Sequence, residues 1–284
     1  MPTPPQLQPE RELLLVFPQW QGAGQVPGLR ESALALAAAV GGHRRRREVE
    51  VPPGHPLDME GGIHGRRELL AQLVAARSIL AAERPGRVFT LGGDCGIEVA
   101  VVSHLAARYG GELAMVWLDA HPDLNTPESS PSGHFHGMPL RVLLGEGDPA
   151  FCARVERPLS PRQIVLSGTR SLDPPEEALV TKRGLRLLSP ATLTERPEEL
   201  LRWLHASGLA RVYVHLDLDV CDPRDLPDVA CPTPGGLAVD ALLHLLRTLR
   251  GEVEIAGAGL TEALFAGPSV PDALGPILEW FDGL

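Results

Sequence analysis

The chain has 284 residues, a length at which α/β folds commonly form one core, so we expect a single domain over residues 1–284. Its formal net charge of -10 argues against a nucleic-acid partner and against an anionic membrane surface, and no apolar stretch reaches the length of a membrane span. Hydrophobic residues make up 44% but aromatic residues only 4%. The core must therefore rest on Leu, Val, Ile and Ala, as in parallel sheets covered by helices.

The first residues carry acids and prolines instead of a basic region before an apolar segment, so they do not resemble a secretory signal. We interpret residues 1–11 as a short disordered lead. The four cysteines, at positions 95, 152, 221 and 231, lack the spacing of a disulfide framework. We therefore expect a cytoplasmic protein with reduced cysteines.

Short apolar runs alternate along the chain with longer segments of helical periodicity, such as His64 to Glu83 and Val239 to Leu249. The runs that predict strands are Leu13 to Phe17, Arg47 to Val51, Val88 to Leu91, Leu113 to Leu118, Gln163 to Leu166, Leu185 to Leu188, Arg211 to Leu216 and Val253 to Leu260. This alternation predicts an α/β fold of three αβα layers around a mainly parallel sheet of about eight strands. The arginine run Arg44 to Arg47 is expected to form a solvated loop face.

The apolar run Leu113 to Leu118 ends in three potential metal ligands, Asp119, His121 and Asp123. Side chains in an extended segment alternate between two faces, so these residues can point into one cavity past the end of a strand. A set of two carboxylates and one imidazole suits a hard or borderline divalent cation. The alternative is a polar loop that contains a satisfied histidine.

A second polar cluster follows the run Arg211 to Leu216 and contains Asp217, Asp219 and Asp222. If the two clusters share a crevice, their carboxylates repel one another unless cations neutralise them, and two cations are the natural answer. The same repulsion predicts that neutralising Asp119 or Asp217 stabilises the metal-free protein.

Other polar residues also follow predicted strands, namely Cys95, Asp173 and Glu262. The carboxyl ends of strands in an open α/β sheet face a common crevice, which is where ligands bind. For Asp173, which precedes Pro174, a role as a helix cap is the alternative.

The segments LDAHPDLN, from Leu118, and DLDVCDP, from Asp217, resemble the ureohydrolase family, which comprises arginases, agmatinases and formimidoylglutamases. GGDC at Gly92 to Cys95 and GAGLTE at Gly257 to Glu262 match further family motifs in the same order. The resemblance therefore spans almost the whole chain from about Leu13. It implies an arginase/deacetylase-like fold, a small-molecule substrate, a centre of two divalent metal ions, usually manganese, and a homo-oligomer, either a trimer or a hexamer.

The loop from Asn125 to Gly137 resembles arginases more than the other ureohydrolases. The resemblance implies that Asn125, Ser130 and Ser132 contact the carboxylate and amino ends of an amino acid substrate. Asp173 would hold the substrate amino group. Glu262 would face the guanidinium, which a carboxylate holds best in bidentate fashion.

The resemblance also implies a mechanism in which a metal-bridging hydroxide attacks the guanidinium carbon and urea is released. Asp123 would orient the hydroxide, and His136 would deliver a proton to the leaving amine, since the ordinary pKa of histidine is near neutral. The neighbouring His134 is interpreted as a partly exposed loop residue. The metal ligands implied by the resemblance are Cys95, Asp119, His121, Asp123, Asp217 and Asp219.

Three positions depart from the family pattern: Cys95 replaces a metal-binding histidine, Cys231 a site threonine and Gly259 an acid. A thiolate favours zinc, iron or nickel over manganese, so the first metal site is expected to hold a softer ion or to be empty. Three hypotheses follow. The chain hydrolyses arginine or a close amino acid analogue; it hydrolyses another substrate such as agmatine, formimidoylglutamate or a guanidino acid; or it is a non-catalytic relative with an impaired first metal site.

Overall fold

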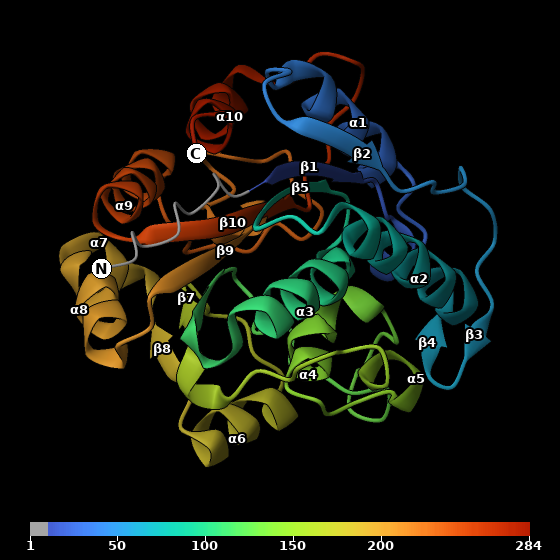
Figure 1. Cartoon of the computed structure of the whole chain (residues 1–284), viewed down its shortest axis with the longest axis horizontal. Coiled ribbons are helices and arrows are strands. Elements are labelled where there is room, and N and C mark those ends of the chain that lie inside the picture. Colours follow the sequence, from blue (N-terminus) through green and yellow to red (C-terminus); the bar gives the residue numbers. More distant parts are fainter. Residues whose placement is uncertain (1–10) are drawn as a thin grey trace, which may run out of the picture.

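The computed structural model describes residues 11–284, and its centre is one sheet in which all neighbouring strands are parallel (Figure 1). The strand order is β2-β1-β5-β10-β9-β6-β7-β8. The strands are β1 (Glu12–Phe17), β2 (Arg45–Glu48), β5 (Arg87–Gly92), β6 (Leu113–Leu118), β7 (Ile164–Ser167), β8 (Arg186–Leu188), β9 (Arg211–Asp217) and β10 (Glu254–Thr261). A separate antiparallel hairpin is formed by β3 (Met59–Glu60) and β4 (Ile63–His64).

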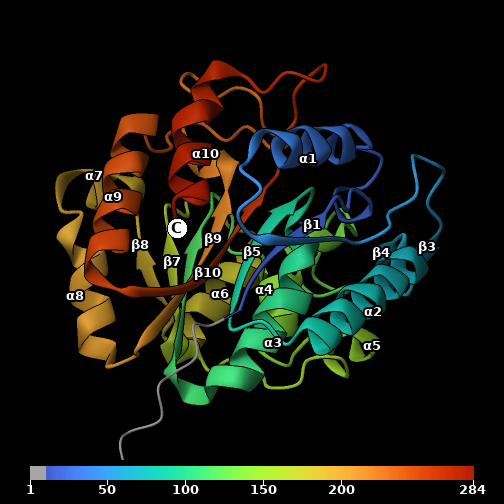
Figure 2. The same ribbon diagram turned by 45° about the horizontal axis from the view of Figure 1, so that its top comes forward.

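Helices cover both faces of the sheet (Figure 2), because successive strand residues point to opposite faces and both faces are apolar. Leu13 and Leu15 pack with α2 and α3, whereas Leu14 and Val16 pack with α9 and α10. The helices are α1 (Gly28–Ala39), α2 (Arg66–Glu83), α3 (Glu98–Tyr109), α4 (Pro139–Leu143), α5 (Pro149–Cys152), α6 (Pro174–Arg183), α7 (Pro190–Glu195), α8 (Glu198–Ser207), α9 (Val239–Glu252) and α10 (Gly275–Asp282). The predicted fold of three layers is therefore confirmed.

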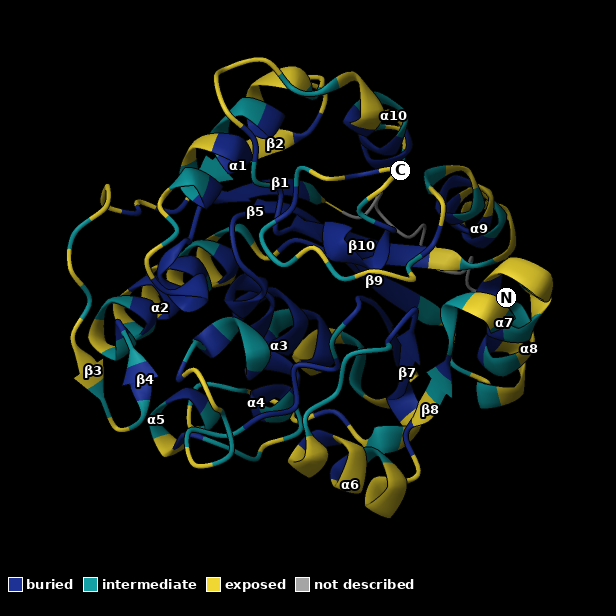
Figure 3. Ribbon diagram, turned by 180° about the vertical axis from the view of Figure 1, so that it is seen from behind, coloured by how far each residue is buried: buried dark blue, intermediate teal, exposed yellow. Residues whose placement is uncertain are grey.

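The predicted strands agree best with the structure in the middle of the sheet, where β6 has the predicted bounds. The agreement is worst at the edge, where the run Arg47 to Val51 was expected and β2 is observed at Arg45–Glu48. This strand pairs with β1 on one side and is mostly exposed (Figure 3), so it needs no apolar side chains. The apolar residues Val49 and Val51 follow it and are buried in the core.

The arginine run at this edge is not a solvated loop face, and that prediction was wrong. Three of its residues lie in β2, and Arg44 is only 7% exposed. The Arg44 guanidinium lies 4.0 Å from the ring centroid of Phe89 and 3.5 Å from the Asp282 carboxylate. A stacked and paired guanidinium can be buried at low cost, which the sequence run alone did not indicate.

The predicted disordered lead, residues 1–11, lies outside the described residues except for Arg11. The Arg11 carbonyl accepts hydrogen bonds from the backbone N–H groups of Gly86 and Arg87, at 2.9 and 3.2 Å. In the described range, residues 11–284, no helix combines the length and the apolar character that crossing a membrane requires. All four cysteines are free.

The parallel sheet brings the predicted site segments to one edge. The strands β5, β10, β9 and β6 are consecutive neighbours, and their carboxyl ends precede Cys95, Glu262, Asp219 and Asp119 in that order. Because these ends share one edge, segments far apart in sequence meet there.

Candidate metal centre and active site

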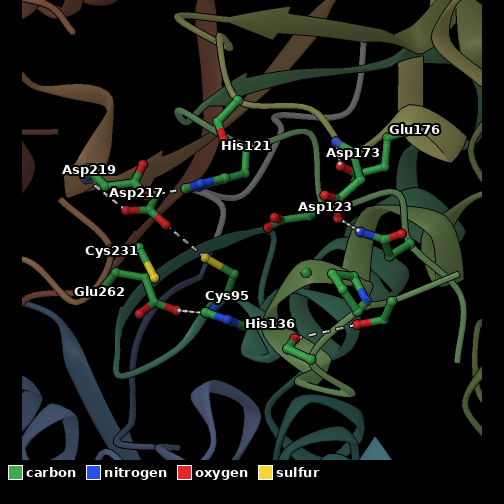
Figure 4. A pocket seen from close by; sticks show the side chains of 16 residues that line it. Cys95, His121, Asp123, His136, Asp173, Glu176, Asp217, Asp219, Cys231 and Glu262 are labelled. Carbon is green, nitrogen blue, oxygen red and sulfur yellow. Dashed lines mark hydrogen bonds and ion pairs between the residues drawn. The ribbon is translucent and has the colours of Figure 1, made fainter. Parts of the chain in front are cut away.

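A pocket opens at this edge of the sheet, and all but one of the predicted site residues line it (Figure 4). The exception is Asp119, which is fully buried. The predicted residues that line the pocket are Cys95, His121, Asp123, Asn125, Ser130, Ser132, His136, Asp173, Asp217, Asp219 and Glu262. The sheet therefore assembles residues from the loops after five of its strands, β5, β6, β7, β9 and β10, into one cavity.

One half of the charged cluster consists of Asp119, His121 and Asp219, whose ligand atoms all lie within 4.8 Å of one another. We call this group the imidazole side. His121 Nδ1 lies 3.0 Å from Asp219 Oδ2 and 3.5 Å from Asp119 Oδ1. The backbone N–H groups of His121 and Ala120 donate to Asp119 Oδ1 and Asp219 Oδ1, at 2.6 and 3.0 Å. The turn after β6 thus fixes both carboxylates around the ring.

The pKa values of this group show how its charges balance. Burial alone would lower the pKa of His121, but its hydrogen bonds with Asp119 and Asp219 outweigh burial and raise that pKa to about 11. Burial would raise the pKa of Asp119, yet the rings of His121 and His215 hold it below its usual range. One nitrogen and two carboxylates that share a proton in this way are also a suitable ligand set for a divalent cation.

The other half of the cluster consists of Cys95, Asp217 and Glu262, again with ligand atoms within 4.8 Å of one another. We call this group the sulfur side. Cys95 Sγ donates to Asp217 Oδ2 at 3.1 Å, and the Cys95 backbone N–H donates to Glu262 Oε1 at 3.1 Å. Burial, followed by the charge of Asp217, raises the pKa of the Cys95 thiol well above its usual range. Burial and the neighbouring carboxylates raise the pKa of Asp217 in the same way.

Unpartnered oxygen atoms test whether these residues fit metal ions. Asp123 Oδ2 and Glu262 Oε2 are buried without a hydrogen-bond partner among the described residues. A buried carboxylate oxygen without a partner is costly, and a divalent cation removes that cost while it stabilises the charged form of neighbouring acids and thiols. The residues present therefore fit divalent cations, and the buried Asp, His and Cys groups of this cluster could bind them.

Two site carboxylates occupy left-handed backbone conformations that residues with a side chain rarely adopt. Asp123 has φ 51° and Glu262 has φ 63°. Hydrogen bonds hold both residues: the Asp123 carbonyl accepts from Arg141 N–H at 3.2 Å, and Glu262 N–H donates to the Gly93 carbonyl at 2.7 Å. Such backbone strain typically gathers at functional sites, where the surrounding structure maintains it.

The aspartate of the GGDC segment holds the loop together and is not a pocket residue. Asp94 accepts hydrogen bonds from the N–H groups of Gly22 and Gly96 and from Gln19 Nε2, at 2.8, 2.9 and 2.8 Å. A Cβ atom at Gly93 would lie 1.8 Å from the Gln19 carbonyl oxygen, so only glycine permits this close approach. The segment thereby places Cys95 at the pocket.

The end of the pocket away from the charged cluster is polar and partly exposed. Asn125 Nδ2 donates to Asp173 Oδ2 at 2.8 Å, and Ser129 Oγ donates to Asn125 Oδ1 at 2.7 Å. Asp173 is also the N-cap of α6, so the helix-cap alternative and the pocket position both describe this residue. Ser130 and Ser132 line the mouth, with their hydroxyl oxygens 3.4 Å apart.

Two histidines of the loop differ in their environment. His136 Nδ1 lies 3.1 Å from Glu262 Oε1. Burial would lower the pKa of His136, but the charge and hydrogen bond of Glu262 raise it above its usual value. His134 is half-buried, with its ring centroid 5.9 Å from that of His136, in agreement with its interpretation as a partly exposed loop residue.

Sequence reasoning missed several residues at or next to the pocket. Glu176 lines the pocket and accepts from the N–H groups of Leu124 and Asp173, both at 2.9 Å. Its spacing three residues after Asp173 is that of a capping box, which could have indicated it. Glu98 and His215 lie behind the pocket, and their only signal was that each interrupts an apolar run.

Comparison with known proteins agrees with this geometry. Residues 33–264 match the family model described as "Arginase family". An arginase of Staphylococcus aureus is 36% identical over 177 residues, which cover 61% of this chain and 58% of that protein. The match to this curated relative thus spans somewhat over half of its length.

Solved structures share the fold over nearly the whole chain. The arginase of Entamoeba histolytica in complex with L-ornithine has a TM-score of 0.85 at 21% identity, with 96% of this chain and 98% of that chain covered. The formimidoylglutamase of Bacillus subtilis has a TM-score of 0.73 at 17% identity, with 98% and 87% covered. At these identities the structural likenesses show the fold alone, whereas the family model covers most of the sequence. The chain therefore belongs to the arginase family.

Proposed function

We propose that this chain hydrolyses a linear guanidino or amidino compound, with arginine or a close amino acid analogue as substrate and urea as a product. The observation that carries this proposal is the Glu262 carboxylate. It is 1% exposed, lines the pocket beside the metal-ligand cluster and has an unpartnered Oε2 atom. A planar guanidinium is the cation that a free carboxylate edge holds best.

Two divalent cations would lower the pKa of a bound water molecule and so supply the nucleophile at neutral pH. The residues that would hold them are Cys95, Asp119, His121, Asp123, Asp217 and Asp219. Asp123 has a second task in this proposal. Its unpartnered Oδ2 faces the cluster and can accept a hydrogen bond from the attacking water, which orients a lone pair toward the guanidinium carbon.

His136 is proposed to protonate the leaving amine. Glu262 Oε1 lies 3.1 Å from His136 Nδ1, and its charge raises the pKa of the ring above its usual value, which favours the protonated form. A proton donor beside the carboxylate that holds the guanidinium is in reach of the amine produced when the C–N bond breaks. The ring therefore combines the position and the raised pKa that suit a general acid.

The polar end of the pocket is proposed to select the substrate by its amino acid part. Asp173 lies across the pocket from Glu262 (Figure 4), and it would pair with the substrate amino group while Asn125, Ser130 and Ser132 contact the carboxylate. The L-ornithine in the arginase of Entamoeba histolytica is an amino acid ligand of this kind.

Two observations favour the alternatives. The hydrogen bond between Asn125 and Asp173 occupies groups that an amino acid substrate would need, which favours agmatine, formimidoylglutamate or a guanidino acid. The hydrogen bond between Cys95 and Asp217 gives the thiol a partner without a metal, which favours a non-catalytic relative with an impaired first site.

Further parts of the proposal concern the metal and the assembly. We propose manganese at the imidazole side and either a softer ion or no ion at the sulfur side. We also propose a single domain over residues 1–284, a homo-oligomer (trimer or hexamer) and a location in the cytoplasm. Sedimentation of the purified protein tests the assembly directly.

The proposal is tested by a substrate panel on the full chain. Urea release is measured with arginine, agmatine and guanidino acids, and product formation with formimidoylglutamate, each before and after removal of metal by a chelator. We expect the highest kcat/KM with arginine or a close analogue and loss of turnover on chelation. Faster turnover of agmatine would overturn the roles of Asn125 and Ser132, and no turnover of any substrate by metal-loaded protein would overturn the enzymatic proposal.

A further inference from the structure

Behind the sulfur side lies a buried row of three polar residues that the proposed reaction does not use. Glu98, in the first turn of α3, and Tyr213 and His215, on β9, are all 0% exposed. Glu98 Oε2 accepts from the Tyr213 hydroxyl at 2.7 Å, and Glu98 Oε1 lies 2.9 Å from His215 Nδ1. A Cβ atom at Gly259 would lie 2.0 Å from Glu98 Oε1, so the glycine in place of the family acid makes room for this carboxylate.

The other ring nitrogen of His215 faces the metal-ligand cluster. His215 Nε2 is buried, has no hydrogen-bond partner within the described part of the chain and lies 3.5 Å from Asp119 Oδ2. The ring is stacked on Trp117 with centroids 3.7 Å apart, which fixes its plane. An imidazole whose Nδ1–H is held by a carboxylate presents the Nε2 lone pair in a fixed direction, as metal-binding histidines do.

We infer that His215 is a ligand of the first metal ion, together with Cys95, Asp119 and Asp123, and that Glu98 is its positioning residue. The ligand atoms of these four residues lie within 4.8 Å of one another. This inference rests on the proposed metal centre and deepens it. The imidazole that the loop after β5 lacks, because Cys95 stands there, is supplied by β9.

The inferred ligand set explains why several unusual residues occur together. One nitrogen, one sulfur and two oxygens form a four-ligand set that suits zinc or another borderline ion. Cys95 provides a softer ligand, His215 provides the nitrogen, Glu98 holds His215, and Gly259 leaves space for Glu98. The other interpretation of the row is a metal-free ion pair of His215 with Glu98 and Asp119, and the experiment separates the two.

The direct test uses the unmodified chain, loaded with zinc and studied by X-ray absorption. Imidazole rings bound to a metal give outer-shell scattering that can be counted. We expect two imidazoles and one sulfur per two zinc ions, the imidazoles being those of His121 and His215. One imidazole per two ions would overturn the inference, because His215 would then be an ion-pair partner only.

Variants give an independent readout in metal titrations of the stripped protein, with bound zinc counted by elemental analysis. His215→Gln should bind only one of the two ions. Glu98→Gln should lower the affinity for that same ion roughly 10- to 100-fold, because the imidazole loses the carboxylate that orients it. His104→Gln is the matched control, since His104 is a partly buried histidine of α3 that bonds the Pro85 carbonyl away from the site, and it should keep both ions. Circular dichroism checks that each variant is folded. If His215→Gln does not fold, the number of imidazole ligands in the X-ray absorption spectrum of the unmodified chain still tests whether His215 binds the metal.

The outcomes separate this inference from the proposed function. If the parent binds two ions and releases urea while folded His215→Gln retains both ions with unchanged affinity, the inference alone is wrong. If the parent binds no divalent ion at all, the proposed metal centre fails and the inference fails with it.

Discussion

The two halves of the charged cluster differ in how they neutralise their acids. On the imidazole side, the ring of His121 lies between Asp119 and Asp219, and the pKa of Asp119 is held below its usual range. On the sulfur side, His136 lies against Glu262, whereas Cys95 and Asp217 are hydrogen-bonded to each other and their pKa values are raised well above their usual ranges. The acids of the imidazole side are thus balanced by a histidine, whereas burial and neighbouring charges disfavour the ionised forms of Cys95 and Asp217 on the sulfur side.

This difference has a consequence for metal binding. A cation that enters the imidazole side must displace the proton of His121, whereas a cation that enters the sulfur side must displace the proton of the Cys95 thiol. The carboxylate and imidazole ligands of the first case suit manganese, and the thiol of the second does not. We therefore expect the two ions to differ in affinity and in metal preference.

The largest expected effect separates Asp119 from Asp217. Asp119→Asn removes the carboxylate that pairs with two histidines, so the metal-free protein should lose roughly 3 kcal/mol of unfolding free energy, and both ions and all activity should be lost. Asp217→Asn should also abolish activity and metal binding but should stabilise the metal-free protein, since Asp217 is held among other acids. For Asp119 the expected sign is thus the opposite of the one that repulsion between carboxylates alone predicts.

Denaturant unfolding in the presence of a chelator measures both stabilities, and elemental analysis measures the metal. Equal stability changes of the same sign in the two variants would contradict the comparison. Retention of both ions in both variants would refute their assignment as ligands.

Next in size is the effect of Glu262→Gln, which keeps the shape of the side chain and removes its charge. Loss of the charged partner of a guanidinium should lower kcat/KM roughly 10²- to 10³-fold, by analogy with other buried electrostatic contacts of a transition state. Glu177→Gln, on the exposed side of α6, is the control and should have no effect. Steady-state kinetics with the preferred substrate measure this effect. A change in kcat/KM below about threefold would show that Glu262 does not contact the guanidinium.

The polar end of the pocket is probed by two substitutions of Asp173. Asp173→Ala should raise KM about tenfold by loss of the partner of the substrate amino group and should also cost about 1 kcal/mol of stability by loss of the α6 cap. Asp173→Ser keeps a capping side chain and should raise KM alone. Kinetics and thermal unfolding of both variants separate the roles, and an unchanged KM in both would leave Asp173 as a cap only.

The pH dependence of the metal-free protein follows from the raised pKa values. The pKa of His121 is raised to about 11 from 6.5, so the stability from its pairing is complete below about pH 6.5 and is lost as pH rises toward 11. Burial and the charge of Glu262 raise the pKa of Asp94 from 3.8 to about 7, so stability also falls as pH rises from about 4 to about 7, and only the last part of this loss lies above pH 6. Metal-free Tm should fall by roughly 5 °C between about pH 6 and about pH 9. A Tm that rises over this interval would contradict the charge balance described above.

The smallest expected effect is that of Cys95→His. An imidazole at this position should raise manganese affinity and turnover severalfold, because it suits the ion and cannot be oxidised to a disulfide or sulfenic acid. Manganese titration and urea release measure both quantities. Unchanged affinity and turnover would place Cys95 outside the first metal site.

The fold and most of the pocket were predictable because they depend on local signals. Apolar runs mark β6 and β9, and the polar residues that follow them must meet at the carboxyl edge of a parallel sheet. Asp173 was recognisable for the same reason and Asn125 only from the family resemblance of its loop, and neither signal indicated their mutual hydrogen bond. The predicted bounds of the edge strand β2 were wrong because this strand has a partner on one side only and its side chains are charged.

What the sequence did not reveal depends on pairing between distant buried residues. Glu98 Oε1 in α3 lies 2.9 Å from His215 Nδ1 in β9. Nothing in the sequence around either residue indicates this contact. The role of Gly259 is also visible only in three dimensions, because it consists of the space left for the Glu98 carboxylate. The lowered pKa of Asp119 likewise depends on the positions of His121 and His215, which the sequence does not show.

A count of bound metal ions tests whether the pocket holds a metal centre with an intact imidazole side and an altered sulfur side. The protein is purified without added metal, analysed for bound elements and then titrated with manganese. We expect one tight manganese site, which is lost in His121→Gln, and a second site that binds manganese weakly and is strengthened in Cys95→His. Absence of any bound divalent ion after titration, or two equivalent manganese sites, would contradict this expectation.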